Sequence, residues 1–178
     1  MRVEKGLLHM LPPVVSIISK KNSGKTTLLE KLIPELKTRG YRVGTVKHDT
    51  HGYEIDHKGK DTWRHKQAGA DTVAISSPWK VSVIKDVAEE VSIDQIVAQH
   101  FGDMDIVITE GYKRAAKPQI EIFRSTAHKS PLHTKEDKKH LTAIVSDVDV
   151  DLGVPRFDIN DVVSIADFIE KTFIKAAK

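Results

Sequence analysis

The stretch Ser19–Thr27 constrains the fold of this chain more than any other part of the sequence. It follows a mostly apolar, β-branched run, Val14–Ile18, and precedes a segment whose leucines and isoleucines recur at helical spacing. A strand, a polar loop ending in Gly-Lys-Thr and a helix form the context of a phosphate-binding loop. The stretch therefore predicts a nucleotide site at the end of the first strand.

The residue types in this loop suit the binding of phosphate and a divalent cation. We expect Asn22, Ser23 and Gly24 to turn the chain so that successive backbone N–H groups face an anion at the positive end of the next helix. Lys25 supplies a full charge for the β- and γ-phosphates. Thr26 places a hydroxyl where Mg²⁺, which requires oxygen ligands, is held.

Ser19 and Thr27 stand at the two ends of the loop. Thr27 is counted with the phosphate-binding residues, whereas Ser19 departs from the pattern G-x-x-x-x-G-K-[ST], which has glycine there. Glycine at such a position often serves a positive φ or a close backbone approach. A side chain there is expected to cost about 1 kcal/mol unless the local dihedral angles tolerate it.

Length and composition restrict the class of protein. A chain of 178 residues predicts a single P-loop NTPase domain spanning residues 1–178, with a flexible N-terminal extension at 1–12. The 28 basic and 25 acidic residues give a net charge of +3, which suits phosphate ligands and does not argue for nucleic acid. Cysteine is absent, which excludes disulfides and thiolate metal sites. With neither a secretion signal nor a long apolar run, we expect no membrane contact and a cytoplasmic location.

Strand and helix patterns alternate along the rest of the chain. This alternation predicts a three-layer α/β/α fold with a mainly parallel sheet and right-handed crossovers. Pro34 lies inside the first expected helix and predicts a kink or an early end there. The turn signal Ser77-Pro78 predicts a β-hairpin insertion. Strands are expected at 41–47, 72–76, 80–84, 105–111, 119–124 (half-exposed) and 141–146, and helices at 24–39, at 61–69, after Ser92 and after a cap at Asn160.

Two acidic residues follow expected strands and are candidates for metal binding or catalysis. Glu110 ends a buried parallel strand, where open α/β sheets bind ligands, and is the candidate Mg²⁺ carboxylate. Asp49 follows the second strand and is either a second Mg²⁺ or water contact or a solvated loop residue. Asp105, at the start of its strand, is assigned a structural role. Together with Lys25, these carboxylates Glu110 and Asp49 form the predicted catalytic set.

The histidines and the candidate base readers leave alternatives open. His48 and His51 favour contacts with phosphate, an acidic group or a partner, because the spacing of the histidines in this region matches no compact metal site. Thr134–Asp137 superficially matches a guanine-reading motif but follows a polar stretch, which favours a charged loop. Asp147 follows a true strand and is the better candidate for reading the base.

Four segments together resemble the MobB family of molybdopterin-guanine dinucleotide biosynthesis adaptor proteins, with a likeness extending from about Val14 to Ile169. The phosphate loop alone is shared by many NTPases, whereas its combination with the other three segments is far more discriminating. These segments are Ser19–Thr27, Val46–His51, Asp56–His65 with Ala68–Ala70, and Thr109–Lys113.

The resemblance implies a homodimeric protein that binds GTP with Mg²⁺ and hydrolyses it slowly. It implies an adaptor for the molybdenum cofactor guanylyltransferase, which joins GMP to molybdopterin, so a molybdopterin-type cofactor is a further candidate ligand. On this reading the loop from His48 to Lys60 faces the γ-phosphate, the cofactor or the partner, and Arg64, His65, Tyr112 and Lys113 extend an anion-binding surface. The alternatives are a small-molecule kinase or ligase of the same fold, and a nickel-insertion GTPase.

Overall fold

The computed structural model describes residues 11–177, which form two compact units. The larger unit contains the chain up to His48 and from Ile93 onward, and the smaller unit is Asp49–Ser92. Most of the N-terminal extension expected at 1–12 lies outside the described residues, and Pro12, which is described, is buried. The single domain expected over residues 1–178 stays a prediction.

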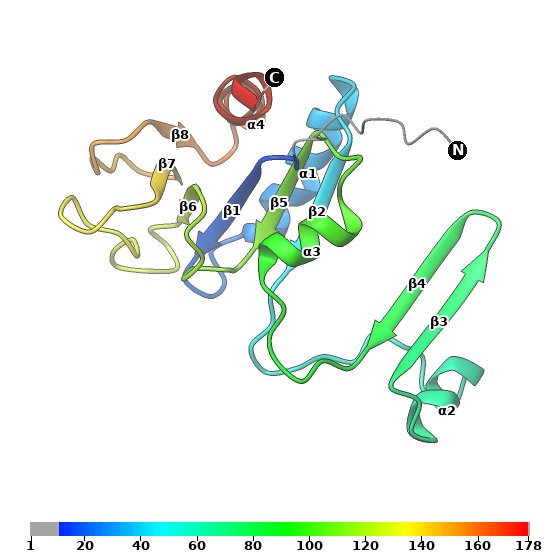
Figure 1. The fold of residues 1–178 in the computed structure, drawn as a ribbon. Helices are drawn as coiled ribbons and strands as arrows, with labels where there is room; N and C mark the ends of the chain where they lie inside the picture. Colours follow the sequence, from blue (N-terminus) through cyan, green and yellow to red (C-terminus); the bar gives the residue numbers. More distant parts are fainter. Residues whose placement is uncertain (1–10, 178) are drawn as a thin grey trace. The chain divides into compact units, whose positions relative to one another are not determined.

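A six-stranded sheet with the order β2-β5-β1-β6-β7-β8 forms the centre of the larger unit (Figure 1). Every neighbouring pair in this sheet is parallel, so the predicted parallel α/β fold is confirmed. Parallel strands end at the same edge, which brings the loops that follow them together. The strands are β1 (Val14–Ser19), β2 (Val43–Lys47), β5 (Ile106–Glu110), β6 (Gln119–Phe123), β7 (Leu141–Ser146) and β8 (Arg156–Asp158).

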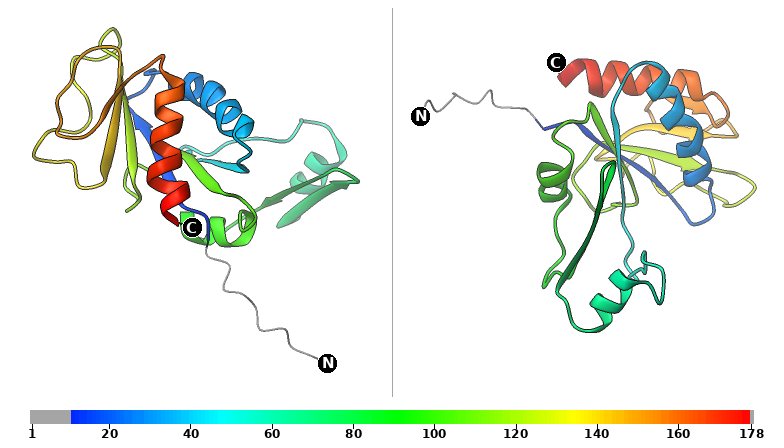
Figure 2. Two further views of the ribbon diagram at one scale, coloured as in Figure 1. Left: turned by 90° about the horizontal axis from the view of Figure 1, so that it is seen from above. Right: turned by 90° about the vertical axis from the view of Figure 1, so that its right-hand side faces the viewer.

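Helices cover both faces of this sheet, as Figure 2 shows. Helix α1 (Lys25–Thr38) and helix α4 (Val162–Ile169) pack on one face, against the side chains that include Ile17, Ile108 and Ile120. Helix α3 (Ile93–His100) packs on the opposite face through its buried apolar residues. Because side chains alternate along a strand, neighbouring residues of the buried strands supply both apolar layers.

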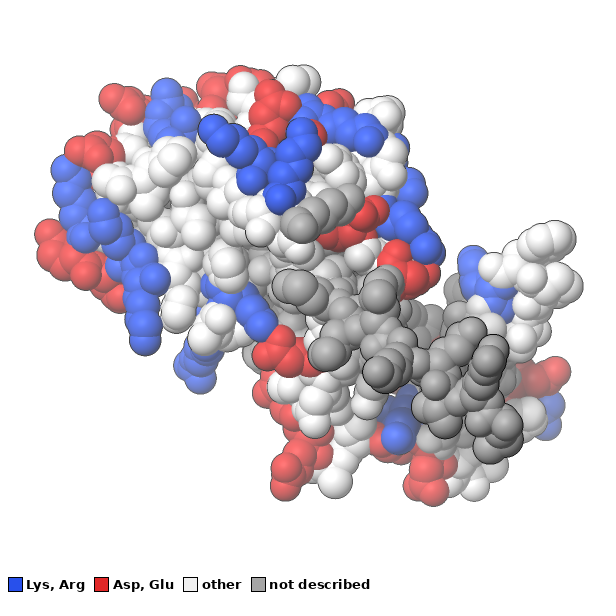
Figure 3. Space-filling model, turned by 45° about the horizontal axis from the view of Figure 1, so that its top comes forward, with Lys and Arg blue, Asp and Glu red and all other residues white. Residues whose placement is uncertain are grey.

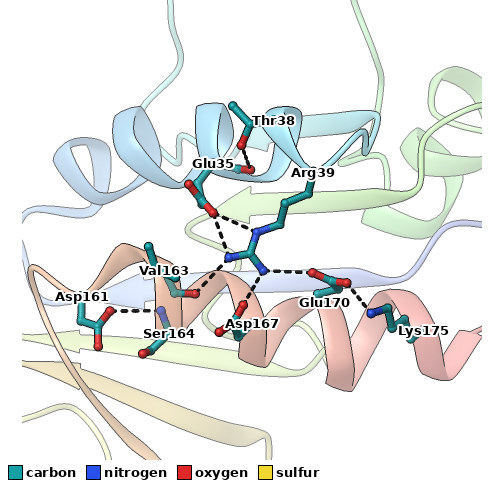
Figure 4. Close-up of polar contacts among 9 residues, drawn as sticks. All are labelled: Glu35, Thr38, Arg39, Asp161, Val163, Ser164, Asp167, Glu170 and Lys175. Atoms are coloured by element: carbon teal, nitrogen blue, oxygen red, sulfur yellow. Dashed lines mark hydrogen bonds and ion pairs between the residues drawn. The ribbon is translucent and has the colours of Figure 1, made fainter.

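Arg39 links α1 to α4 and to the helical turn Glu170–Ile174, and Glu170 in turn pairs with Lys175 of the last turn, Lys175–Ala177 (Figure 4). Its guanidinium donates to Glu35 at 2.9 Å, to Asp167 at 2.6 Å and to Glu170 at 2.9 Å. Planar guanidinium groups suit such multiple pairing with carboxylates. The network therefore fixes the C-terminal helical region against α1.

Two expected helix details differ from the structure. Helix α1 continues through Pro34 for its full 14 residues, so the early end allowed by the sequence does not occur. The cap of α4 is Asp161, not Asn160, because the Asp161 carboxylate accepts the Ser164 N–H at 3.1 Å.

The end of α1 before Gly40, which has φ 87°, agrees with the prediction.

Strand β6 was expected to be half-exposed, and this is wrong. All of its residues are buried, because it lies between β1 and β7 in the middle of the sheet. Its alternating polar residues are Gln119, which donates to the Lys113 carbonyl at 3.0 Å, and Glu121, which accepts three hydrogen bonds from the chain at 132–133. Distant partners therefore allow polar side chains in a buried strand.

The smaller unit contains helix α2 (Asp61–Gln67) and the antiparallel hairpin of β3 (Thr72–Ser77) and β4 (Lys80–Lys85). The predicted hairpin is thus confirmed. Several of its apolar side chains are exposed, including Ile75, Val81 and Val83, and Trp79 in the turn is 94% exposed.

The described surface carries charges of both signs. On the face drawn in Figure 3, lysine and arginine side chains are interspersed with aspartate and glutamate. Over residues 11–177, none of the helices has the length and apolarity needed to cross a bilayer.

Candidate phosphate-binding site

A pocket of about 410 Å³ lies over the start of α1 in the larger unit. The structure brings the predicted loop residues and Glu110 together here, because β5 pairs with β1 and places Glu110 opposite Ile17, near the point where the phosphate loop leaves the sheet. The pocket is lined by Lys21, Asn22, Ser23, Gly24, Lys25, Thr26, Thr27 and Glu110.

Two residues with positive φ shape the loop. Asn22 has φ 62°, which asparagine tolerates better than most residues, and Gly24 has φ 92°. The Ser23 hydroxyl donates to the Lys20 carbonyl at 3.1 Å and closes the turn. The Gly24 carbonyl accepts the Leu28 N–H at 2.9 Å, so α1 begins directly after it. The N–H groups of the first helical turn thus have no partner within the helix and are available to an anion.

Ser19 ends β1 without a positive φ, so the backbone there does not require glycine. Its hydroxyl donates to the Lys20 carbonyl at 2.6 Å and accepts a hydrogen bond from Lys25 Nζ at 2.8 Å. No positive-φ strain therefore accompanies this departure from the pattern, and the serine hydroxyl holds the ammonium group of Lys25.

Lys25 is partly buried, with one carboxylate and two further lysines close enough to act on its ammonium group. Burial is the main cause that lowers its pKa from the usual value, and the charges of Lys113 and Lys47 lower it further, while Glu110 acts in the opposite direction. An excess of positive charge around a partly buried pocket favours an anionic ligand. Lys113 is itself exposed.

A strained turn after β5 places Glu110 and His48. Gly111 has φ 100° and Tyr112 has φ 52°, and the ring of Tyr112 stacks on His48 with centroids 4.5 Å apart. The His48 N–H donates to the Glu110 carbonyl at 3.0 Å. A Cβ on Gly111 would lie 3.3 Å from the Cβ and the carbonyl oxygen of His48, so this close approach favours glycine.

The oxygen atoms in the pocket suit Mg²⁺. Thr26 presents an exposed hydroxyl, and Glu110 presents a partly exposed carboxylate at the carboxyl end of β5. Hydroxyl and carboxylate oxygens are ligands that Mg²⁺ accepts alongside nucleotide phosphates and water. Within the described part of the chain, no group of three or more His, Asp or Glu side chains could by itself hold a metal ion.

Three other candidates, Asp49, His51 and Asp147, have hydrogen-bond partners of their own. Asp49 and His51 belong to the smaller unit, where the Asp49 carboxylate accepts the His51 N–H at 2.8 Å. Asp147 uses both carboxylate oxygens on Ser125, accepting its N–H at 2.8 Å and its hydroxyl at 3.2 Å. These bonds, led by the one from the backbone, lower the pKa of Asp147. The assignments of Asp49, His51 and Asp147 stay predictions.

Arg124, which follows β6, is not one of the residues predicted from the sequence. Its Nη2 atom comes within 3.4 Å of the place that a Cβ on Gly24 would occupy. The rule that selected Glu110, a polar residue at the carboxyl end of a parallel strand, also applies to Arg124. The residue was missed because β6 was taken for a half-exposed strand.

The model of the MobB family, described as molybdopterin guanine dinucleotide synthesis protein B, matches residues 14–147. The chain belongs to the MobB family. The membership predicted from the four segments is therefore confirmed, and so is the role in molybdopterin-guanine dinucleotide biosynthesis at the level of the family.

Relatives and solved structures agree with MobB membership. The molybdopterin-guanine dinucleotide biosynthesis adapter proteins of Haemophilus influenzae and Escherichia coli are 36% and 35% identical to this chain. The matches cover 89% and 88% of this chain, and 88% and 91% of those proteins. A crystal structure of molybdopterin-guanine biosynthesis protein B superposes with a TM-score of 0.71 at 34% identity, covering 89% of this chain and 97% of the other.

Proposed function

We propose that this chain is a GTP-binding adapter that assists attachment of GMP to molybdopterin. The observation that carries the proposal is the pocket in which the phosphate loop, the ammonium of Lys25, the hydroxyl of Thr26 and the carboxylate of Glu110 meet. Its positive charge supports a triphosphate, and its oxygen atoms support Mg²⁺. The names of the two bacterial relatives support the biosynthetic pathway.

Within this proposal each group has a defined role. Backbone N–H groups at Asn22–Gly24 and the start of α1 bind the phosphates, and Lys25 neutralises their charge. Thr26 and Glu110 hold Mg²⁺, which supplies additional charge neutralisation when bound. Asp49 contributes a second carboxylate. Slow hydrolysis fits a protein whose nucleotide serves as a signal or a delivered substrate.

The partner of the adapter is proposed to be the molybdenum cofactor guanylyltransferase, with a molybdopterin-type cofactor as a second ligand. His48, His51 and Lys113 are the proposed contacts for anionic groups of these ligands. We further propose a cytoplasmic homodimer. Val81 and Val83, which the register of β3 and β4 places on one face of the hairpin, are exposed and support self-association, because exposed apolar surface often marks an interface.

Calorimetric titration with GTP and ATP, each with and without Mg²⁺, tests the nucleotide site. Lys25→Ala is expected to weaken GTP binding by at least about tenfold, because it removes a charge-assisted contact to phosphate. Lys31→Ala removes the same charge from an exposed position on α1 and is expected to leave the affinity nearly unchanged. Equal affinities of wild type and Lys25→Ala would refute the site.

The adapter role is tested by measuring dinucleotide formation by the guanylyltransferase with and without this protein. Faster formation in the presence of wild-type protein, lost in Lys25→Ala, is the expected result. GTP turnover that accelerates with a small-molecule acceptor in place of the transferase would instead identify a kinase or ligase. A transferase that is indifferent to the protein would remove the adapter role.

A further inference from the structure

Arg124 places a guanidinium beside the phosphate loop, on the side opposite Glu110. In the sheet, β5 and β6 flank β1, so their carboxyl ends lie on the two sides of the loop that leaves β1. Register pairs Ile17 with Glu110 and Ser19 with Ile122, and Arg124 follows just beyond this pairing. Residues from the two strands that flank β1 therefore approach the loop after β1 from both sides.

The guanidinium covers the glycine at which α1 begins. Its Nη2 and Nε atoms come within 3.4 Å and 3.9 Å of the position of a Cβ on Gly24. Gly24 lines the pocket and carries one of the backbone N–H groups expected to face phosphate. The positive charge of Arg124 thus lies next to the place where the sequence and the pocket indicate negative charge.

The donors of Arg124 are not used by the protein itself. Among residues 11–177 no group accepts a hydrogen bond from its guanidinium. The positive charge of Arg124 helps to lower the pKa of Asp147, but the carboxylate of Asp147 accepts its hydrogen bonds from Ser125 and not from Arg124. Arginine presents a planar fork of donors that matches phosphate oxygens. These donors are therefore available to a ligand.

The backbone of Arg124 is held in place by the chain that follows it. Its carbonyl accepts the N–H groups of Ala127 and His128, both at 3.1 Å. His128 Nε2 lies 2.6 Å from the Lys21 carbonyl, and Lys20 Nζ donates to the Ser130 carbonyl at 2.7 Å. The segment that carries Arg124 is thus attached directly to the phosphate loop, so its backbone is already ordered before a ligand binds.

We propose that Arg124 is a further nucleotide-binding residue, which pairs with the phosphates of bound nucleotide from the β6 side of the loop. The inference rests on the proposed function, because it assumes that the pocket takes a nucleoside triphosphate. It adds a second cationic contact to Lys25 and assigns a role to the turn after β6.

Titrations of GTP and of inorganic tripolyphosphate, both with Mg²⁺, test the inference in four variants. Arg124→Gln is expected to raise the Kd of both ligands by about tenfold to a hundredfold, the usual effect of losing a charge-assisted hydrogen bond. Arg124→Lys keeps the charge without the fork of donors and should fall between wild type and Arg124→Gln. Lys25→Ala reports on the pocket independently.

Arg42→Gln is the matched control, because Arg42 is exposed, precedes β2 at the opposite edge of the sheet and pairs with Asp103. Arg42→Gln removes the same charge as Arg124→Gln. Because Arg42 is far from the pocket, both affinities should stay within about twofold of wild type. Thermal unfolding of each variant checks that the fold is intact. If Arg124→Gln does not fold, Arg124→Lys carries the test.

The outcomes separate this inference from the proposed function. If Lys25→Ala weakens binding and the Arg124 variants behave like Arg42→Gln, the role of Arg124 is overturned while the nucleotide site stands. If Arg124→Gln weakens GTP but not tripolyphosphate, the contact is to the nucleoside and the inference is again overturned. If wild-type protein binds neither ligand, both proposals fail.

Discussion

Replacement of Glu121 tests how a buried carboxylate supports the region around the phosphate loop. Its side chain is 1% exposed, and it accepts hydrogen bonds from the Leu132 N–H, the His133 N–H at 3.0 Å and His133 Nδ1 at 2.7 Å. Glu121→Met keeps a similar volume and removes every acceptor. The variant leaves two backbone donors and an imidazole without their partner.

The magnitude follows from the environment of those donors. Each buried donor left unsatisfied costs about 1–3 kcal/mol, and Glu121→Met leaves three donors without their acceptor. The side chain of His133 is 15% exposed and Leu132 is 37% exposed, so water reaches this segment once it loosens. We therefore expect the free energy of unfolding to fall by about 2–4 kcal/mol, which is near the lower end of the summed cost of the donors left unsatisfied.

Urea denaturation followed by circular dichroism measures this loss. With a slope of about 2–3 kcal/mol per molar urea, the midpoint should fall by about 1 M. Glu136→Gln, an exposed position in the same connection between β6 and β7, serves as the control and should shift the midpoint little. A Glu121→Met midpoint equal to that of the control would refute the reasoning that a buried hydrogen-bonded carboxylate holds this connection.

Three other predictions concern packing, pH and the loop serine. Gly44→Ala should destabilise the protein by about 1–3 kcal/mol in thermal unfolding, because its Cβ would lie 2.3 Å from Phe101 Cδ1; an unchanged midpoint would show that the ring moves freely. Hydrogen bonds to Glu170, first from Lys175 and then from Arg39, lower its pKa to about 2, so its stabilising contribution is present above its ordinary pKa of 4.5 and is lost as pH falls toward 2. The midpoints of wild type and Glu170→Gln should therefore converge over that range, and a constant difference would contradict the assignment. Ser19→Ala removes the acceptor of the Lys25 ammonium and should cost the nucleotide-free protein about 1–2 kcal/mol in urea denaturation, whereas no cost would mean that water replaces the hydroxyl fully.

Local patterns predicted the elements of this chain well where one physical signal dominates. The Gly-Lys-Thr stretch after an apolar run predicted the loop between β1 and α1, and Ser77-Pro78 predicted the hairpin. The end of α1 before Gly40 was also predicted, since a residue with φ 87° at a helix end favours glycine. These signals depend on the chain within a few residues, which is why they can be read without the fold.

Other features depend on residues that are far apart in the sequence. Strand β6 alternates like a half-exposed strand, yet it is buried in the middle of the sheet, and Glu121 is tolerated there because its partners lie in the chain at 132–133. The choice of Asp161 over Asn160 as the cap of α4 depends on which side chain reaches the Ser164 N–H in the folded backbone. Neither outcome can be derived from periodicity, because hydrogen-bond partners are set by tertiary packing.

The sequence by itself determined the parallel α/β class, the loop between β1 and α1 that carries the candidate residues, and the family. Each of these depends on contiguous motifs and on the alternation of strands and helices. Only the tertiary structure decided that Ser19 holds Lys25 at no backbone cost, and that Arg124 lies over Gly24. The physical reason is the strand order, because β5 and β6 flank β1 and bring residues nearly a hundred positions away to the phosphate loop.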